Sequence, residues 1–170
     1  GMPPGRHPVK TYAIGSQMLQ RVFNFMGREM EAGHQVYVVC PLVEKSEKQD
    51  LASAVSVYEE LRDRIFPMFP VGLVHGRMKN SEKEAVMQAF HRGEKKLLVA
   101  TSVIEVGVNV PNATIMFVYG ADRFGLSQLH QLRGRVGRGE AQAYCILYSD
   151  NQNEITQLRM KLMCEIQDRS

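Results

Sequence analysis

The stretch 96-KLLVATSVIEVGVNVPNATIMFVY-119 contains two short runs that are apolar almost throughout, at 96–100 and 114–119. Such runs are typical of strands in a parallel sheet, because helices cover both faces of that kind of sheet. Similar runs occur at 12–14, 35–40, 71–75 and 143–148, and the segments between the runs have helical periodicity. The sequence therefore predicts an α/β fold, with a mostly parallel central sheet flanked by helices on both faces.

Three other segments carry helix patterns. The segment 51–65 places its apolar residues on one face, and the next helix begins at 81-SEKE-84, where Ser81 and Glu84 predict a capping box. A last helix near the end of the chain has apolar residues at helical spacing: Ile155, Leu158, Leu162, Met163 and Ile166. Ligands of open α/β sheets generally lie beyond the carboxyl ends of the strands, so we expect the functional residues to follow the strands.

Length and composition fit one globular domain. The chain has 170 residues, 44% of them hydrophobic, and a net charge of +3 that is too balanced to indicate a polyanionic partner by itself. Its three cysteines predict reduced thiols, with neither a disulfide frame nor a zinc site. No apolar run is long enough to span a membrane and the start lacks a signal-peptide core, so we expect a cytoplasmic protein with no membrane partner.

The expected division of the chain has three parts. Residues 1–8 are interpreted as a tag remnant and entry segment, because a glycine precedes Met2. Residues 9–150 form the α/β domain, and residues 151–170 form a further helical segment. No internal repeat or interdomain linker is visible in the sequence.

A cluster of arginines and glycines stands out in 128-QLHQLRGRVGRG-139. The pattern predicts a short helix that ends near Gly134, with Arg135 and Arg138 displayed at a glycine-rich turn. A guanidinium presents a planar fork of donors that matches phosphate oxygens, so these two arginines could close on one triphosphate, with Gln131 as a further donor. A solvated basic turn explains the spacing equally well.

The motifs that would hold a nucleotide are absent from the sequence. The nearest approach to a GxxxxGK[ST] phosphate loop is 120-GADRFGLS-127, where Leu126 replaces the required lysine. No acidic pair follows a strand to hold magnesium. The chain is therefore expected to contact a bound nucleotide without being able to bind and hydrolyse it alone.

The segment 97–113 followed by 128–139 resembles motifs V and VI of superfamily 2 helicases. Within that superfamily the sequence is similar to the RecG family of ATP-dependent DNA helicases. The similar segments are 72-GLVHGRM-78, 105-EVGVNVPNA-113 and 124-FGLSQLHQLRGRVGRG-139. The transcription-repair coupling factor Mfd shares most of the last stretch but usually differs in the other two. The resemblance extends from about Pro4 to the end of the chain, and it implies a RecA-like fold without its own phosphate loop.

The resemblance implies a nucleotide-facing set of residues. Arg135 and Arg138 match the arginine fingers of motif VI, which reach ATP held by a preceding RecA-like domain, and Gln131 matches the leading polar residue of that motif. Gly107 and Asn109 match the part of motif V that approaches the nucleotide. Many relatives have aspartate where Asn109 stands, so its contact with the ribose is the less secure assignment.

The resemblance also implies a DNA-facing set. Thr101 matches the motif V residue whose hydroxyl contacts the nucleic-acid backbone, although a turn hydrogen bond is the alternative role for it. His75 and Arg77 follow a strand and fit the same surface, and His75 fits a structural donor equally well. Arg133 lies between the pattern positions, where a salt bridge or an interdomain contact is expected rather than a phosphate contact.

The implied function is that of a helicase motor domain that helps to remodel stalled replication forks and recombination junctions. ATP and magnesium would be held mainly by an N-terminal RecA-like domain, and branched or forked DNA would be the other partner. Residues 151–170 would begin a C-terminal helical hairpin. No metal site is expected in this chain, because its histidines lack ligand spacing.

Three other functions are weighed against this one. The basic turn could belong to a nucleic-acid-binding module without a catalytic role, or the chain could be the equivalent domain of an Mfd-type translocase. A dinucleotide-binding oxidoreductase domain is disfavoured, because no GxGxxG follows a strand.

Overall fold

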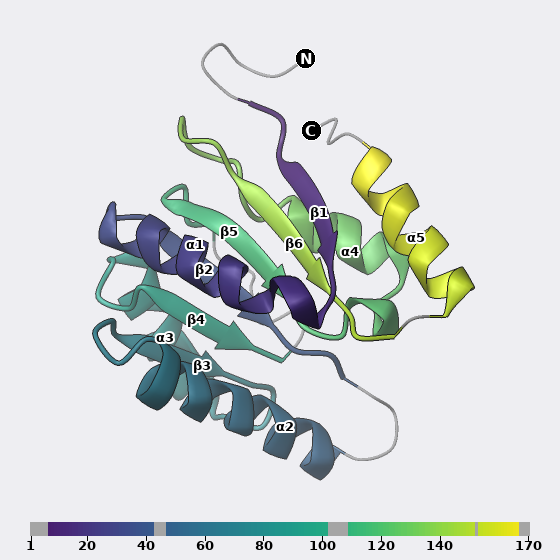
Figure 1. Cartoon of the computed structure of the whole chain (residues 1–170). Helices are drawn as coiled ribbons and strands as arrows, with labels where there is room; N and C mark the ends of the chain where they lie inside the picture. The colour runs from purple at the N-terminus through teal and green to yellow at the C-terminus, as the bar shows by residue number, and fades with distance from the viewer. Residues whose placement is uncertain (1–6, 43–46, 102–108, 152, 167–170) are drawn as a thin grey trace.

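A computed structural model describes residues 7–42, 47–101, 109–151 and 153–166 of the chain. Six parallel strands form one sheet in the order β1-β6-β5-β2-β4-β3 (Figure 1). The strands are β1 (Lys10–Ile14), β2 (Gln35–Val39), β3 (Val71–Val74), β4 (Leu97–Ala100), β5 (Ala113–Val118) and β6 (Tyr144–Tyr148). The predicted α/β fold with a parallel central sheet is confirmed, and each strand lies within two residues of its expected position.

Helices cover both faces of the sheet and make three layers (Figure 1). The α-helices are α1 (Leu19–Glu31), α2 (Glu47–Glu60), α3 (Asn80–His91), α4 (Leu126–Arg133) and α5 (Glu154–Glu165). Short helical turns are η1 (Ser16–Met18), η2 (Leu61–Ile65) and η4 (Ala121–Arg123). One core lies between the sheet and the pair α1 and α2, and the other lies between the sheet and α3, α4 and α5. Alternate residues of each strand point into one core or the other, which explains the continuous apolar runs.

The start of α3 differs from its prediction. The helix begins at Asn80, and the backbone N–H of Lys79 donates to Glu82 Oε1 at 3.4 Å. The expected capping pair of Ser81 and Glu84 is therefore wrong by two residues, because both lie inside the helix. Gly93 follows the end of the helix with a φ of 80°, a backbone conformation that favours glycine.

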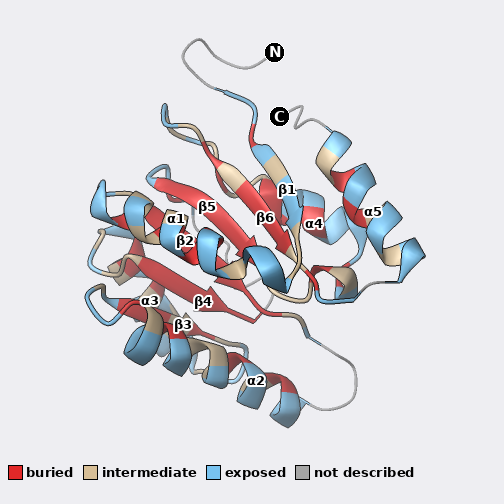
Figure 2. Cartoon of the chain, in the orientation of Figure 1, coloured by how far each residue is buried: buried red, intermediate tan, exposed pale blue. Residues whose placement is uncertain are grey.

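Strand β1 is unlike the inner strands. Every residue of β2 and β5 is buried, whereas no residue of β1 is, and Figure 2 shows this contrast along the sheet. β1 lies at one end of the strand order, and α5 packs against it on one face. On the other face α1 lies over the middle of the sheet, so that β1 is left partly uncovered there (Figure 1).

Candidate functional site

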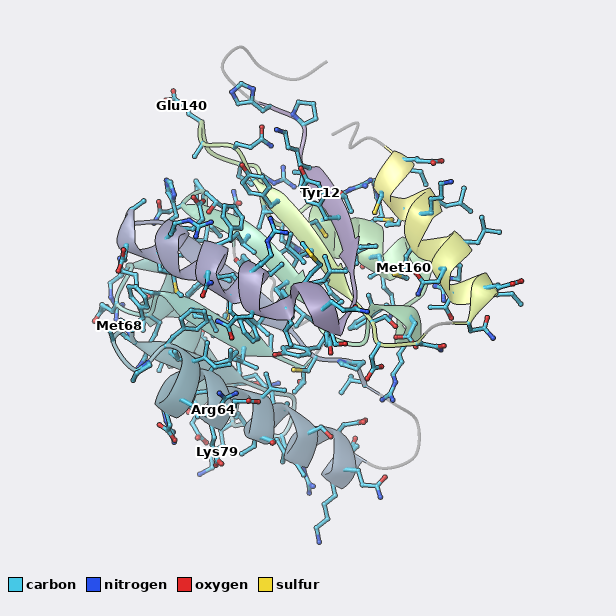
Figure 3. All side chains as sticks on the ribbon, viewed as in Figure 1. Tyr12, Arg64, Met68, Lys79, Glu140 and Met160 are labelled. Atoms are coloured by element: carbon cyan, nitrogen blue, oxygen red, sulfur yellow. The ribbon has the colours of Figure 1, made fainter. Side chains whose placement is uncertain are left out.

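The arginine-bearing turn lies at the amino ends of the strands. It follows α4, which carries the chain back from the carboxyl end of β5 across about 12 Å, at 1.5 Å per residue. Gly137 packs against Val9 and Ala143, which directly precede β1 and β6, and Gly139 packs against Pro111, just before β5. Figure 3 labels Glu140 at this end of the sheet. The expectation that functional residues follow the strands is therefore wrong for this turn, because α4 separates it from β5.

Two glycines of the turn are required by its geometry. Gly137 has a φ of 80°, and a Cβ atom on it would lie 2.8 Å from Val9 Cγ2. A Cβ atom on Gly139 would lie 2.7 Å from the backbone oxygen of Pro111. Real Cβ atoms do not approach other atoms so closely, so a side chain at either position would displace the turn. The glycines therefore hold the flanking arginines against the amino ends of β1, β5 and β6.

Arg135 and Arg138 stand at the surface of this turn, as the sequence predicts. Arg138 is exposed, and its Nε donates to the backbone oxygen of Gly134 at 2.9 Å. Arg135 is half-buried, and its charge acts on Tyr37 in the middle of β2. Burial raises the pKa of Tyr37 to about 12, and the guanidinium of Arg135 partly opposes that rise. The two arginines therefore project from a rigid turn that lies beside the core under α3 and α4.

Asn109 and Gln131 belong to the same region. Asn109 is exposed and lies two residues before Pro111, whose backbone meets Gly139. Gln131 is exposed on the last turn of α4. The structure thus places Gln131, Arg135 and Arg138 on α4 and the turn that follows it, and this turn meets the segment that carries Asn109. Gly107, the fifth residue expected near a nucleotide, lies outside the described residues.

Arg133 has a different environment from the other two arginines. It is fully buried, and its Nη1 donates to the backbone oxygens of Ile166 at 2.6 Å and Met163 at 3.1 Å, and to Thr11 Oγ1 at 3.4 Å. Its Nη2 lies 3.1 Å from His130 Nδ1. Of the two alternatives expected for Arg133, the salt bridge is wrong, because no carboxylate among the described residues pairs with it and its Nε has no partner there. The contact with the segment 151–170 corresponds to the other alternative, a contact beyond the domain expected at 9–150.

The end of helix α5 compensates the buried charge of Arg133. An uncompensated charge in a protein core is strongly unfavourable. The backbone oxygens of Met163 and Ile166 lie at the C-terminal end of α5, where the helix dipole places a partial negative charge. Arg133 therefore caps α5 and ties it to α4. The sequence contained a signal for this burial, because Arg133 follows Leu129 by four residues and so shares its buried helical face.

The residues expected to face DNA lie at the carboxyl edge of the sheet. Val74 and Ala100 are paired in neighbouring strands, so His75 and Thr101 leave the sheet side by side. The backbone N–H of Arg77 donates to His75 Nδ1 at 3.2 Å, which gives the histidine a structural role in this turn. The side chain of Arg77 is exposed, whereas Thr101 is only 4% exposed. Of this set, Arg77 is the side chain that stands free to meet a partner.

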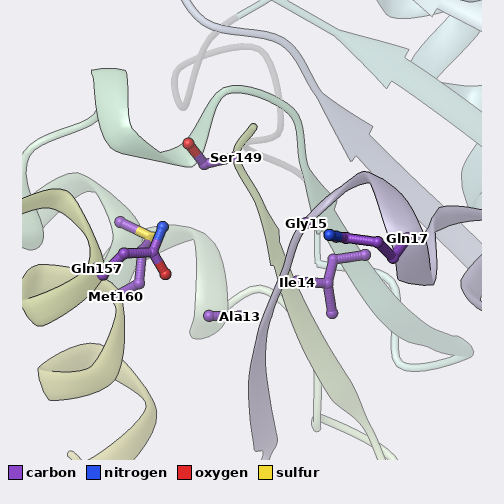
Figure 4. A pocket seen from close by; sticks show the side chains of 7 residues that line it. All are labelled: Ala13, Ile14, Gly15, Gln17, Ser149, Gln157 and Met160. Atoms are coloured by element: carbon purple, nitrogen blue, oxygen red, sulfur yellow. The ribbon is translucent and has the colours of Figure 1, made fainter. Parts of the chain in front are cut away.

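Other features of the described residues add no second chemical site. A pocket of ≈ 120 Å³ lies between the ends of β1 and β6 and helix α5, lined by Gln17, Ser149 and Gln157 among others, and none of the candidate residues lines it (Figure 4). The described part of the chain holds no group of three potential metal ligands. None of its helices is long and apolar enough to cross a membrane.

Comparison with known families identifies the domain. The family model described as "Helicase conserved C-terminal domain" matches residues 16–140, which include β2 to β5, α4 and the arginine-bearing turn. The chain belongs to this helicase family. The match accounts for the RecA-like arrangement of the sheet and for the position of the turn within it.

Relatives of this helicase domain include the ATP-dependent DNA helicases RecG. The chain is 50% identical to the protein of Bacillus subtilis (strain 168) over 167 residues, which are 98% of the chain and 24% of that protein. It is 45% identical to the RecG of Thermotoga maritima over 160 residues, 94% of the chain and 20% of that protein. The predicted resemblance to RecG is confirmed, and the chain spans about a quarter of the length of these relatives.

Solved structures show the same fold. A structure of RecG bound to a three-way DNA junction aligns with a TM-score of 0.80 and 41% identity, over 97% of this chain and 21% of that one. The C-terminal domain of the DEAD-box protein Dbp5 aligns with a TM-score of 0.62 at 17% identity, over 93% of this chain and 87% of that one. The second likeness concerns the fold alone, whereas the first extends to the sequence of the helicase domain.

Proposed function

We propose that this chain is the C-terminal motor domain of an ATP-dependent DNA helicase of the RecG type. In this proposal Arg135 and Arg138 are arginine fingers that reach ATP bound by a preceding RecA-like domain of the same protein. The observation that supports the proposal is the glycine turn, where Gly139 lies against Pro111, so that the backbone carrying Arg135 and Arg138 meets the segment that begins at Asn109. Guanidiniums stabilise the charge that develops on a transferring phosphoryl group.

The proposed division of labour leaves magnesium to the other domain. Guanidiniums repel a cation, and Mg²⁺ prefers carboxylate, phosphate and water oxygens. The described residues expected to face the nucleotide, Asn109, Gln131, Arg135 and Arg138, offer amide and guanidinium groups instead, and Glu140 is the carboxylate that directly follows the turn. The chain would thus contribute positive charge and contacts to the nucleotide, with Gly107 and Asn109 near its sugar, while the partner domain holds the metal and the phosphates.

The DNA contact is proposed at the carboxyl edge of the sheet, through Arg77, His75 and Thr101. These residues lie at the opposite end of the strands from the arginine-bearing turn. Contacts to phosphates position a strand without reading its sequence, which suits a motor that moves along any DNA. In the full-length protein this motor would remodel stalled replication forks and recombination junctions.

The division of the chain into domains is also part of the proposal. Residues 9–150 are taken as the motor domain, and α5 as the first part of a helical hairpin within 151–170. Support comes from an exposed apolar row on α5, formed by Ile155, Leu158, Leu162 and Ile166. The buried side of the helix consists of Met160 and Met163, so the exposed row is available to a second helix.

The test uses the full-length protein with Arg138→Ala. ATP turnover should fall by about a thousandfold or more, while binding to forked DNA stays nearly unchanged. Arg92→Ala, at an exposed arginine beyond α3, is the matched control and should leave both measurements unaltered. A variant that loses DNA binding but keeps ATP turnover would support a non-catalytic binding module instead.

Two further measurements separate the proposed sites. Arg77→Ala should weaken DNA binding for all sequences and lower the dependence of log affinity on log salt concentration by about one unit. The isolated chain should show negligible ATPase and weak, salt-sensitive DNA binding. Strong DNA-stimulated hydrolysis by the isolated chain would contradict the division of labour between two domains.

A further inference from the structure

A groove runs between helix α1 and the edge strand β1, on the face of the sheet that α5 does not cover. Its volume is ≈ 380 Å³, and side chains from η1, α1, β1 and β6 line it. The apolar side chains that line it include Tyr12, Met18, Phe25 and Tyr144. Phe25 and Tyr144 meet edge to face, with their ring centroids 4.9 Å apart. The groove is therefore built from well-packed side chains of four elements.

The groove leaves apolar side chains in contact with water. Tyr12 is 48% exposed and Met18 is 37% exposed, and they lie on β1 and η1, two elements that hold no buried residue. Parallel sheets are normally covered on both faces, and β1 is the strand of this sheet that is not. A contiguous apolar surface with a polar rim marks an interaction site.

Positive charge lines one side of the groove without a counter-ion. Arg21 and Arg28 are exposed on α1, and the described residues that line the groove include no Asp or Glu. Arg21 Nη1 lies 3.9 Å from Met18 Sδ, and the guanidinium of Arg28 lies over the Phe25 ring at 5.9 Å from its centroid. Neither arginine pairs with a carboxylate among the described residues. The charge of this surface therefore matches an acidic partner.

The spacing of the two arginines sets the distance between the carboxylates of that partner. Seven residues separate them on α1, which is two helical turns or about 10.5 Å. We infer that the groove binds an amphipathic helix that carries two carboxylates seven residues apart, with apolar residues between them on the same face. The carboxylates pair with Arg21 and Arg28, and the apolar residues cover Tyr12, Phe25 and Tyr144.

This surface is separate from the proposed nucleotide and DNA sites. Its lining residues come from α1, β1 and β6 on one face of the sheet, whereas the arginine-bearing turn follows α4 on the other. Relatives about four times as long as this chain leave ample polypeptide to supply such a helix.

The experiment uses the chain with a synthetic helical peptide that has glutamates at positions i and i+7 and leucines at i+3 and i+4. One tryptophan in the peptide reports binding, because the chain itself contains none. The peptide should bind, and Arg21→Glu with Arg28→Glu should weaken binding about tenfold, the effect of two exposed ion pairs. A peptide with lysines in place of the glutamates should then prefer this double variant.

Matched controls separate the groove from general charge effects. Lys48→Glu with Lys161→Glu makes the same change in net charge at exposed residues of α2 and α5, and should leave peptide binding unchanged. Tyr12→Ser, at an exposed side chain, should weaken binding without changing the fold. Equal losses in the control variant, no binding of the glutamate peptide, or self-association of the chain through this groove would each overturn the inference.

Discussion

Arg133 and Arg135 are two residues apart in the sequence, yet they differ in burial and in the groups that they contact. Arg133 is the last residue of α4 and is fully buried against the end of α5, whereas Arg135 stands in the glycine turn that follows. The difference arises from helical periodicity, which turns Arg133 toward the core and ends before Arg135. Arginines within one motif therefore divide between holding the domain together and facing a partner.

The largest effect on folding is expected from Arg133→Met, which keeps the volume of the side chain and removes its donors. The backbone oxygens of Met163 and Ile166 would then lose their partner, so the free energy of unfolding should fall by about 2–4 kcal/mol. Arg135→Ala, at a half-buried surface position, should change it by less than about 1 kcal/mol. Urea denaturation of the two variants measures this contrast.

Hydrogen exchange shows where the loss occurs. In the Arg133→Met variant the amides of α5 should exchange faster than those of β2 and β5, because Arg133 ties α5 to α4. If Arg133→Met were as stable as the original chain, the cost of burying the guanidinium would equal everything that its hydrogen bonds contribute. The two arginines would then differ in their exposure to solvent but not in their contribution to the free energy of unfolding.

A smaller effect is expected from Gly137→Ala in the turn itself. The free energy of unfolding should fall by about 1–3 kcal/mol, because the new Cβ atom would meet Val9 and the backbone has a φ of 80°. Gly93→Ala is the matched control, since Gly93 has the same φ but no atom within 4 Å of its Cβ position. Equal losses in the two variants would show that φ alone matters, and that Val9 does not hold the turn.

The smallest effect concerns alkaline pH and the cysteine beside Arg133. Burial raises the pKa of Cys145 to about 12, and Arg133 partly opposes the rise, whereas burial alone raises the pKa of Cys40 to about 12. Unfolded thiols lose their protons near pH 9 while the folded ones keep them, so this stability is complete below pH 9 and is lost as the pH rises toward 12. Each thiol should contribute a slope of at most about 1.4 kcal/mol per pH unit.

Urea denaturation under reducing conditions between pH 8 and pH 11 measures that slope. Cys40→Ala and Cys145→Ala should each make the decline shallower than in the original chain, whatever their stability at pH 8. An unchanged slope in both variants would place the alkaline loss on other groups, such as the buried hydroxyl of Tyr37, whose pKa is also raised to about 12.

The sequence predicts the sheet well because each inner strand is buried on both faces. The apolar runs at 35–40, 96–100 and 114–119 correspond to β2, β4 and β5, whose residues are all buried, so composition alone locates these strands to within one residue. The helix starts were less predictable. Ser81 and Glu84 have the residue types of a capping box, but the chain enters α3 two residues earlier, where the amide of Lys79 already meets Glu82.

The candidate site was only partly predictable. Residue types located Arg135 and Arg138, but not their position at the amino ends of the strands, because that depends on how far α4 runs back across the sheet. The partner of Arg133 was also hidden from the sequence. Arg133 donates hydrogen bonds to backbone oxygens at the end of a helix about thirty residues away. Every residue has a backbone oxygen, so no residue type in the sequence indicates such an acceptor.

The contact between Gly139 and Pro111 gives the proposed nucleotide site a mechanical property. No side chain separates the two backbones, so the segment that carries Asn109 and the turn that carries Arg138 cannot move closer together. Two segments that are far apart in the sequence thus fix each other's position at the amino ends of the strands.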